Sequence, residues 1–180
     1  MPRPEFNYCP LCGTPLVRGR HGGRDRAACP AEGCGFVHWD NPVPVVAAVV
    51  EREGRVVLVR SNGWPETWYG LVTGFLESNE KPEDAVLREV DEELGIGGTL
   101  ESYIGAYPFE RMNQIIFVYH VLAAPGPIRL CREELADHKE VRIDRLRPWP
   151  RGTGPALRDW LASRGLHPPT VEFGTPIETE

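Results

Sequence analysis

The chain has 180 residues, a hydrophobic fraction of 41%, a charged fraction of 26% and a formal net charge of −6. These values fit one ordinary globular domain or one domain with a small appendage, and no apolar run is long enough to cross a membrane. The negative net charge argues against nonspecific binding of nucleic acid by the whole chain, and the amino terminus lacks the apolar region of a secretory signal. We therefore expect a cytoplasmic protein.

Four of the five cysteines lie close to the amino terminus as two pairs, Cys9 with Cys12 and Cys29 with Cys34. In a reducing compartment such pairs are typical of a tetrahedral zinc site, whereas two disulfides would need an oxidising compartment. We predict that residues 1–42 form a zinc ribbon of two short hairpins that holds a structural Zn²⁺. Cys131 stands alone and is predicted to be a small buried residue.

The ribbon is followed by segments that have the patterns of strands. Residues 41–44 form a stiff Pro-rich linker, and "VVAAVVE" then reads as a strand buried on both faces. A turn at Glu53-Gly54 leads into "RVVLVR", and "LVTGF" follows an aromatic loop, "SNGWPETWYG". Farther along, "TLESYIGAYPF" and "NQIIFVYHVLAA" are predicted to form a long hairpin around "ERM", and "EVRI" to be a last short strand.

The most unusual segment, "GFLESNEKPEDAVLREVDEELGI", carries eight acidic residues between Gly74 and Ile96. Pro82 suits the first turn of a helix and Gly95 its end. At about 100° per residue, Glu92 and Glu93 lie about 60° and 40° to either side of Glu89, so the three share one arc beside the apolar stripe. A solvated acidic face is the alternative, but such a face usually carries Lys or Arg four residues away to relieve repulsion. Three carboxylates on one rigid face suit Mg²⁺ or Mn²⁺.

The last predicted element is a helix, "GPALRDWLASRG", with Leu157, Trp160 and Leu161 facing inwards. A Pro-rich tail follows over residues 166–180 and is expected to be loosely ordered. A strand-rich chain with two helices predicts an α+β fold, with mixed sheets sandwiched between helices.

The acidic segment resembles a complete Nudix box. Gly74, Glu80 and the run from Arg88 to Ile96 fill every fixed position of that motif. The chain is therefore identified as similar to Nudix hydrolases, and the flanking strands fit the family's fold. This resemblance implies a Nudix domain over residues 43–165 and hydrolysis, dependent on Mg²⁺, of nucleoside diphosphates linked to another moiety.

The resemblance also assigns roles to residues of the box. Glu89 and Glu93 match the family's metal ligands, Glu92 matches a further ligand or a water-binding acid, and the carbonyl of Thr73 falls where another ligand is often supplied. Arg88 with Glu80 matches a pair that orients loop and helix. Glu77 is a candidate for contact with metal or substrate. Asn79 stands where a Gly is frequent, which could stiffen the loop but removes no ligand.

The ribbon ahead of the box resembles the NADH pyrophosphatase branch of the family. In that branch an aromatic residue follows the last cysteine, and Trp39 matches it here as a candidate for stacking on a base; a tryptophan that packs in the core is the alternative. Glu134 matches a late glutamate, a candidate ligand or general base, with Glu133 as its rival. The branch's signature after the box is mostly missing, since "GAYPFERMNQ" keeps only Pro108-Phe109. The resemblance therefore supports architecture better than substrate.

The sequence thus favours a Nudix pyrophosphatase that acts on an NAD(H)-like or ADP-ribose-like nucleotide, with either Glu92 or Glu134 as general base. A Nudix-fold module that senses a ligand or binds RNA through the ribbon is the rival, although such modules commonly lose box acids and this chain keeps all of them. We expect a small-molecule nucleotide as partner, no membrane, and either a monomer or a homodimer. Aromatic residues and one arginine outside the box are expected to set substrate preference: Trp39, Trp64, Trp68, Tyr69, Tyr107, Phe109 and Arg111.

Overall fold

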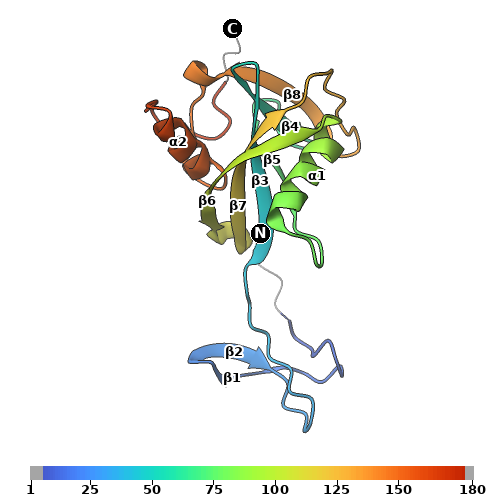
Figure 1. Cartoon of the computed structure of the whole chain (residues 1–180). Helices are drawn as coiled ribbons and strands as arrows, with labels where there is room; N and C mark the ends of the chain where they lie inside the picture. The colour runs from blue at the N-terminus through green and yellow to red at the C-terminus, as the bar shows by residue number, and fades with distance from the viewer. Residues whose placement is uncertain (1–5, 177–180) are drawn as a thin grey trace. The chain divides into compact units, whose positions relative to one another are not determined.

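The computed structural model describes residues 6–176, and the chain falls into two compact units, Met1–Pro42 and Val43–Glu180 (Figure 1). Each unit has its own strands, and both helices belong to the second. In the described part of the chain, no helix is long and apolar enough to span a membrane.

The first unit is built on one antiparallel hairpin of strands β1 (Val17–His21) and β2 (Arg24–Ala28). Gly22 and Gly23 form the turn, with φ of +56° and +78°. A two-residue turn between antiparallel strands needs positive φ at such positions, and glycine adopts it without steric cost. The Arg-rich segment "VRGRHGGRDR" therefore forms this hairpin and its turn.

The second predicted hairpin is reduced to a single bridge between Tyr8 and Pro15. This bridge closes the loop that carries Cys9 and Cys12, and the Cys9 N–H donates to the Thr14 carbonyl at 2.8 Å. The prediction of two hairpins is therefore correct for the β1–β2 pair only. Proline has no N–H to extend a ladder, which fits the short pairing at Pro15.

A six-stranded mixed sheet forms the centre of the second unit. Its strands are β3 (Val43–Arg52), β4 (Arg55–Ser61), β5 (Val72–Phe75), β6 (Gly98–Phe109), β7 (Gln114–Ala123) and β8 (Leu135–Arg142). The strand order is β6-β7-β3-β4-β8, with β5 paired to β3. Only the β3–β7 pair is parallel among the paired strands of the described chain. The strands predicted in this unit are all present, and the mixed sheet with two helices confirms the predicted fold class.

One predicted strand differs in length, and the predicted hairpin is present. The last strand was predicted over "EVRI", but β8 begins earlier, at Leu135, and pairs with β4 over Ser61 to Arg55. Its first half was missed because the residues there are mostly polar and show no apolar pattern. Between β6 and β7, Glu110–Met112 forms a single 3₁₀ turn, so the hairpin predicted there is present. A second 3₁₀ turn, Ile143–Arg145, follows β8.

Helix α1 (Pro82–Leu94) begins and ends where the sequence predicts. Proline stands at its first turn, and Glu83 and Asp84 lie near its positive end. Gly95 ends the helix in the left-handed conformation, with φ of +61°. The helix buries Val86 and Val90 against the sheet.

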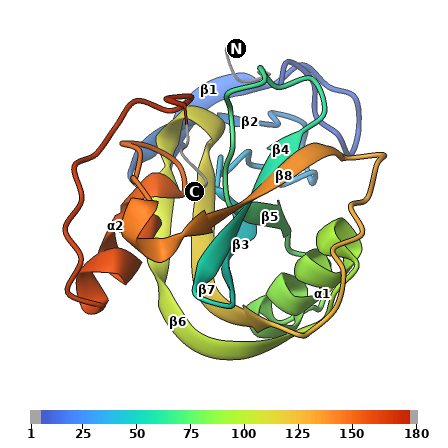
Figure 2. The same ribbon diagram turned by 90° about the horizontal axis from the view of Figure 1, so that it is seen from above.

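Helix α2 (Gly154–Ser163) covers the other face of the sheet, as Figures 1 and 2 show. It buries Leu157, Trp160 and Leu161, the three residues that were predicted to face inwards. The central strand β3 serves both layers, because its alternate side chains point to opposite faces. Val45 and Val49 pack in the core beneath α2, whereas the alternate valines of the strand pack in the core beneath α1.

A charged cluster fastens α2 to the sheet. Glu51 of β3 accepts hydrogen bonds from Arg164 at 2.6 Å and from His120 of β7 at 2.9 Å. The Arg164 guanidinium also lies 4.2 Å from the centroid of the Trp160 ring. Burial lowers the pKa of His120, so the imidazole is neutral near pH 7 and the charge pair of Glu51 is with Arg164.

The described part of the carboxyl-terminal tail is packed on the core, so the expectation of a loose tail is wrong for residues 166–176. The Val171 N–H donates to the Pro148 carbonyl at 2.9 Å. The Phe173 ring lies edge-on to Trp64, Trp68 and Trp149, with centroid distances of 5.2 to 5.8 Å. The aromatic side chain holds the segment in place where a Pro-rich composition alone indicates disorder. Residues 177–180 of the predicted tail lie outside the described part.

Candidate active site

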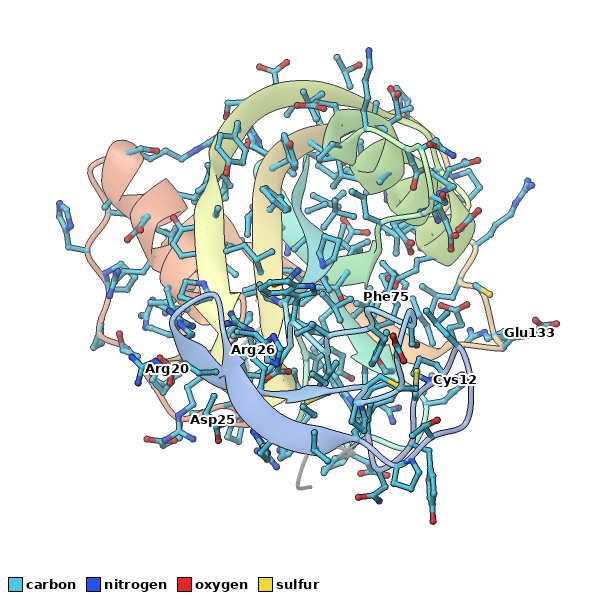
Figure 3. All side chains as sticks on the ribbon, turned by 90° about the horizontal axis from the view of Figure 1, so that it is seen from below. Cys12, Arg20, Asp25, Arg26, Phe75 and Glu133 are labelled. Atoms are coloured by element: carbon cyan, nitrogen blue, oxygen red, sulfur yellow. The ribbon has the colours of Figure 1, made fainter. Side chains whose placement is uncertain are left out.

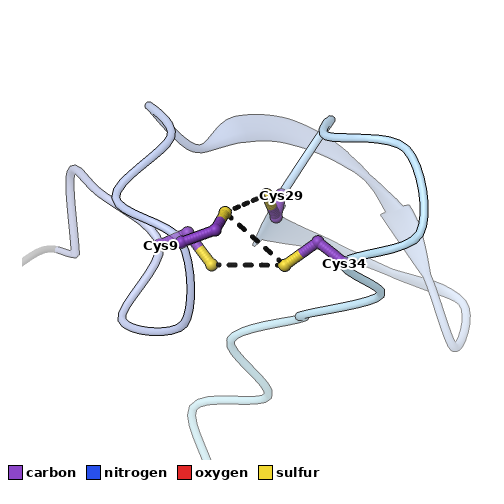
Figure 4. Close-up of side chains that lie close together, drawn as sticks. Cys9, Cys29 and Cys34 are labelled. Atoms are coloured by element: carbon purple, nitrogen blue, oxygen red, sulfur yellow. Dashed lines mark hydrogen bonds between the residues drawn. The ribbon is translucent and has the colours of Figure 1, made fainter.

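Four cysteine thiols converge in the first unit, as Figure 4 shows. The Sγ atom of Cys12 lies 3.5 Å from that of Cys29 and 3.6 Å from that of Cys34, and Cys9 lies 3.6 Å from Cys34. A tetrahedron of thiolates about 2.3 Å from zinc has edges of about 3.8 Å, close to these separations. All four cysteines are free, so the disulfide alternative has no support here.

The environment of Cys12 favours a thiolate. Hydrogen bonds from the hydroxyl and the backbone of Thr14 lower the pKa of Cys12 to about 6. Metal ligation requires deprotonated thiols. Burial raises the pKa of Cys29, and hydrogen bonding with Cys9 together with burial raises the pKa of Cys34 to about 12, so a bound cation would be needed to hold all four as thiolates. Among the His, Cys, Asp and Glu side chains of the described residues, the four cysteines are the one group of three or more whose possible ligand atoms all lie within 4.8 Å of one another. Cys131, expected to be buried, is partly exposed.

Trp39, the candidate for base stacking, belongs to the first unit and has 49% of its surface exposed. The guanidinium of Arg26 lies 4.9 Å from its ring centroid, and Arg26 Nε donates to the Trp39 carbonyl at 3.3 Å. The ring is therefore neither a core residue nor free on both faces. Its role in binding a base stays a prediction.

The acids of α1 divide into buried and exposed members. Glu89 and Glu93 are 9% and 6% exposed, whereas the Glu92 side chain is 59% exposed and Asp91 also faces solvent. The predicted arc of Glu89, Glu92 and Glu93 thus lies at the edge of the surface by which α1 packs on the sheet. Glu93 is on the buried side of this arc and Glu92 on the exposed side. The α1 acids do not gather as closely as the cysteines in the described chain.

A glycine of β5 makes room for Glu89. A Cβ atom added at Gly74 would lie 1.8 to 2.2 Å from the Glu89 carboxylate. Neighbouring Thr73 pairs with Ala47 of β3, and its backbone forms a hydrogen bond with Glu93. Strand β5 and helix α1 therefore meet with the Gly74 backbone against the Glu89 carboxylate, and a larger residue at position 74 would require that carboxylate to move.

Arg88 joins the acidic loop to the helix. Its Nε and Nη2 atoms donate to the two carboxylate oxygens of Glu80, at 2.8 and 3.0 Å. Its Nη1 donates to Glu89 and Glu92, each at 2.8 Å, and Nη2 also donates to the Phe75 carbonyl at 3.1 Å. The hydrogen bonds of Arg88 hold the pKa of Glu80 below its usual range. The pair of Arg88 with Glu80 that the resemblance implies is present. The hydrogen bonds of Arg88 given above all go to groups of the same unit.

The loop before α1 explains two further residues. The Glu77 side chain is exposed, and its backbone N–H donates to Glu80 at 3.0 Å. Asn79 has φ of +65°, in the left-handed region. Asparagine tolerates that region better than most residues, which gives a physical reason for glycine as the common alternative there.

Glu93 is the most perturbed acid of the site. Burial, together with the charges of Glu89 and Glu134, raises its pKa to about 8. Its Oε2 atom is buried and has no hydrogen-bond partner among the described residues. A buried carboxylate oxygen without a donor is costly, and a cation beside it would satisfy it. The donor set therefore fits a hard divalent cation.

Glu134 and its neighbour Glu133 differ in orientation. The charge of Glu134 contributes to raising the pKa of both Glu89 and Glu93. The Asn62 N–H donates to the Glu134 carbonyl at 2.7 Å and fixes this loop to the end of β4. The Glu133 side chain points away from the body of the unit, as Figure 3 shows. Which of the two glutamates acts as ligand or base stays a prediction.

The aromatic residues expected to set substrate preference do not form one group. Trp64 and Trp68 pack against each other and against Phe173, and Tyr69 is buried with its hydroxyl donating to Asp137 at 2.5 Å. Tyr107 donates to Asp159 of α2 at 2.9 Å. These rings contact Phe173 of the tail or side chains that are distant in the sequence. The local sequence pattern does not indicate those contacts.

Comparison with known proteins adds to this geometry. A model of the NUDIX domain matches residues 41–162. The chain is 30% identical over 142 residues to the NAD-capped RNA hydrolase NudC of Stutzerimonas stutzeri strain A1501, which covers 79% of this chain and 50% of that protein. The chain therefore spans about half the length of the curated relatives it matches.

Two solved structures share the fold. A NUDIX hydrolase from Nitrosomonas europaea is similar with a TM-score of 0.73 and 20% identity, over 93% of this chain and 99% of that one. An ADP-ribose pyrophosphatase from Streptococcus suis has a TM-score of 0.57 and 17% identity, over 73% of this chain and all of that one, at 100%. At these identities the similarity concerns the fold.

Adding a methyl group at Gly74 should disturb the site. We expect Gly74→Ala to displace the Glu89 carboxylate and to lower the free energy of unfolding by about 1–3 kcal/mol. Gly97→Ala is the matched control, because no atom lies within 4 Å of its added Cβ and its φ is ordinary. Urea denaturation of both variants checks this, and equal stabilities would contradict the tight contact between β5 and α1.

Without a cation, the ionisation of Glu93 should oppose folding. Its pKa is raised from 4.5 to about 8, so the associated stability is complete below pH 4.5 and is lost as the pH rises towards 8. Glu93→Gln cannot ionise and should be about 3 kcal/mol more stable than the native chain at pH 7, with the advantage vanishing near pH 4.

Urea denaturation in EDTA between pH 4 and 8 measures this difference. Asp91→Asn, on the exposed side of α1, should show no such dependence on pH. A Glu93→Gln advantage that stays constant over the whole range would contradict the raised pKa.

Proposed function

Because the chain belongs to the NUDIX domain family, we propose that it hydrolyses a pyrophosphate bond in a nucleoside diphosphate linked to another moiety. An NAD(H)-like or ADP-ribose-like substrate is favoured. The name of the relative from Stutzerimonas stutzeri supports NAD-linked substrates, including NAD joined to RNA. The observation that carries the proposal is the buried, partnerless Oε2 of Glu93 beside two further acids.

The acids of α1 would hold Mg²⁺ or Mn²⁺. Glu89 and Glu93 are the proposed principal ligands, with Glu92 and the Thr73 carbonyl completing the protein's share of oxygen ligands. When bound, such a cation would withdraw charge from phosphate oxygens and acidify a water molecule. The raised pKa of Glu93 supports this assignment, because the site disfavours negative charge until a cation offsets it.

The proposed reaction is attack by water on one phosphorus of the pyrophosphate. An O–P bond forms from the water, the bond from that phosphorus to the bridging oxygen breaks, and the two products are phosphate monoesters. One proton of the water must pass to a base. Glu134 is the proposed base, since its charge acts on Glu89 and Glu93, whereas Glu92 is hydrogen-bonded to Arg88.

Arg88 is proposed to position these groups. Its recorded hydrogen bonds all go to acids and a carbonyl of the same unit, which supports a role in fixing Glu89 and Glu92. Glu77 and Trp39 are proposed to contact substrate, because both have exposed side chains. Each assignment can be tested through KM separately from kcat.

A structural Zn²⁺ is proposed in the first unit, held by the four thiolates. The separations of the Sγ atoms and the lowered pKa of Cys12 support it. In so small a unit, metal ligation would replace the core that its length cannot provide.

A substrate panel tests the proposed reaction. NADH, NAD⁺, ADP-ribose, a diadenosine polyphosphate, ATP and an NAD-capped RNA oligonucleotide are incubated with the protein and Mg²⁺, and products are separated by chromatography. In ¹⁸O-labelled water, one label should enter one of the two monoester products. Salt-dependent RNA binding with no hydrolysis of any member would favour the rival reading as a binding module.

Removing one ligand should abolish turnover without unfolding the chain. Glu93→Gln and Glu89→Gln should lower kcat by at least about 100-fold, because a neutral amide is a poor ligand for a hard cation. Asp91→Asn should keep near-native rates. Steady-state hydrolysis at several Mg²⁺ concentrations measures this, and full activity of Glu93→Gln at limiting Mg²⁺ would exclude the acid cluster as the catalytic centre.

Substitutions at two adjacent glutamates distinguish the loss of the base from the mere loss of one negative charge. We expect Glu134→Gln to reduce kcat by about 10²–10⁴-fold, the usual contribution of a general base. Glu133→Gln changes the same charge one residue away and should leave kcat unchanged. The pH–rate profile gives the second readout, since loss of the base removes its acidic limb. Equal effects of the two substitutions would reject Glu134 as base.

Elemental analysis tests the zinc proposal. Purified protein should contain about one zinc per chain, and Cys29→Ser should lose most of it along with protection of residues 6–42 from proteolysis. Cys131→Ser is the control and should keep the metal. Disulfides among the four cysteines in protein made in a reducing cytoplasm would contradict the proposal.

A further inference from the structure

A cavity of about 260 Å³ lies in the second unit where the carboxyl-terminal tail crosses the core. Val171 to Pro176 form one wall, and residues from β4, β8 and the segment before α2 form the others. Three of the lining rings are aromatic: Tyr69, Trp149 and Phe173.

This cavity is separate from the acidic site. Its lining residues Leu58, Tyr69 and Val141 belong to the core beneath α2, whereas the buried stripe of α1 belongs to the core on the other face of the sheet. The acids Glu89 and Glu93 do not line it. Its occupancy therefore does not depend on the reaction proposed above.

The walls of the cavity provide flat apolar surfaces. Tyr69 and Trp149 are 4% and 7% exposed and hence fixed, and Phe173 lies edge-on to Trp149 at 5.4 Å. Tyr69 is further held by its hydrogen bond to Asp137. Rigid aromatic walls favour a planar ring, since base–aromatic stacking is selective for flat groups but tolerant of their sequence or substituents.

Cationic groups stand at the same cavity. Arg145 and Arg147 both line it together with one acid, Glu172, and the charge of Arg145 also acts on Asp144. Arg147 Nη1 donates to the carbonyls of Leu146 and Asp144, at 2.8 and 3.3 Å, so the chain turn fixes its guanidinium. The hydroxyl residues Thr67 and Thr175 complete the polar lining. Guanidinium groups are suited to planar, paired hydrogen bonding with phosphate or carboxylate.

We propose that this cavity is a second ligand site, which binds a planar aromatic ring carrying one anionic group, the chemistry of a nucleoside monophosphate. The ring lies among Tyr69, Trp149 and Phe173, and the anion is held by Arg145 and Arg147. The volume is just below the range of about 300–1,000 Å³ typical of sites for drug-sized ligands, which suits one base with one phosphate rather than a dinucleotide. Because the tail is one wall, binding also stabilises the tail against opening.

Isothermal titration of the full chain with AMP in EDTA tests the site, because the acidic centre without a cation repels phosphate. We expect saturable binding at one site per chain, and weaker binding of adenosine and of inorganic phosphate by at least about tenfold each, since each lacks half of the recognised group. Absence of saturable AMP binding would overturn the proposal.

Variants locate the binding. Thr67 is exposed at the cavity, so Thr67→Phe should fill it without disturbing the core and raise the Kd for AMP at least tenfold. Thr99→Phe, on an exposed position of β6 away from the cavity, is the matched control and should change Kd less than twofold. Arg147→Gln should weaken AMP but not adenosine, and thermal melts verify that each variant is folded.

The remaining arms separate this site from the acidic one. Glu93→Gln should bind AMP in EDTA as the native chain does, and AMP should slow proteolytic cleavage after residue 166 in both. AMP binding that survives Thr67→Phe but becomes tighter in Glu93→Gln, which carries one acid fewer, would place the nucleotide at the acidic site and overturn the proposal. Turnover in the presence of Mg²⁺ is measured separately. Absence of AMP binding at the second site therefore does not contradict the proposed reaction, and absence of turnover does not contradict the second site.

Discussion

The organisation of the acidic segment depends on one guanidinium. Arg88 donates to Glu80, Glu89, Glu92 and a backbone carbonyl, and so it ties the loop before α1 to the helix and to the end of β5. Without it, four acids in a short segment would repel one another and leave their orientation undefined. Glu93 is the acid that Arg88 does not reach, and it is also the one whose pKa rises furthest. The arginine thereby leaves the buried Glu93 carboxyl group without a cationic partner among the described residues.

Much of this arrangement could be predicted from local chemistry. Pro82 and Gly95 bound the helix correctly because both act through the backbone of their own turn. The turn at Glu53-Gly54 was predictable for the same reason, and both residues have positive φ. Helical periodicity also placed Glu89 and Glu93 beside the apolar stripe, where the structure has them.

What could not be predicted depends on partners distant in sequence. Periodicity placed Glu89 on the acidic arc, but the close approach of Gly74 of β5 to its carboxylate has no signal in the helix. The packing of Phe173 on three tryptophans has no local signal, since a Pro-rich segment looks the same whether or not an aromatic ring anchors it. The polar strand β8 was partly missed because pairing with β4, not its own pattern, sets its length.

The parallel pairing of β3 with β7 has a consequence for the order of events during synthesis. Val43 pairs with Gln114, and β5 and α1 lie in the intervening segment. Loop closure over such a separation is slow, and β3 has no parallel partner until β7 has left the ribosome. When α1 has been synthesised, the sheet against which it packs is therefore still incomplete. The first unit pairs only neighbouring segments and can fold before the second unit. We expect the second unit to limit the rate at which the chain matures.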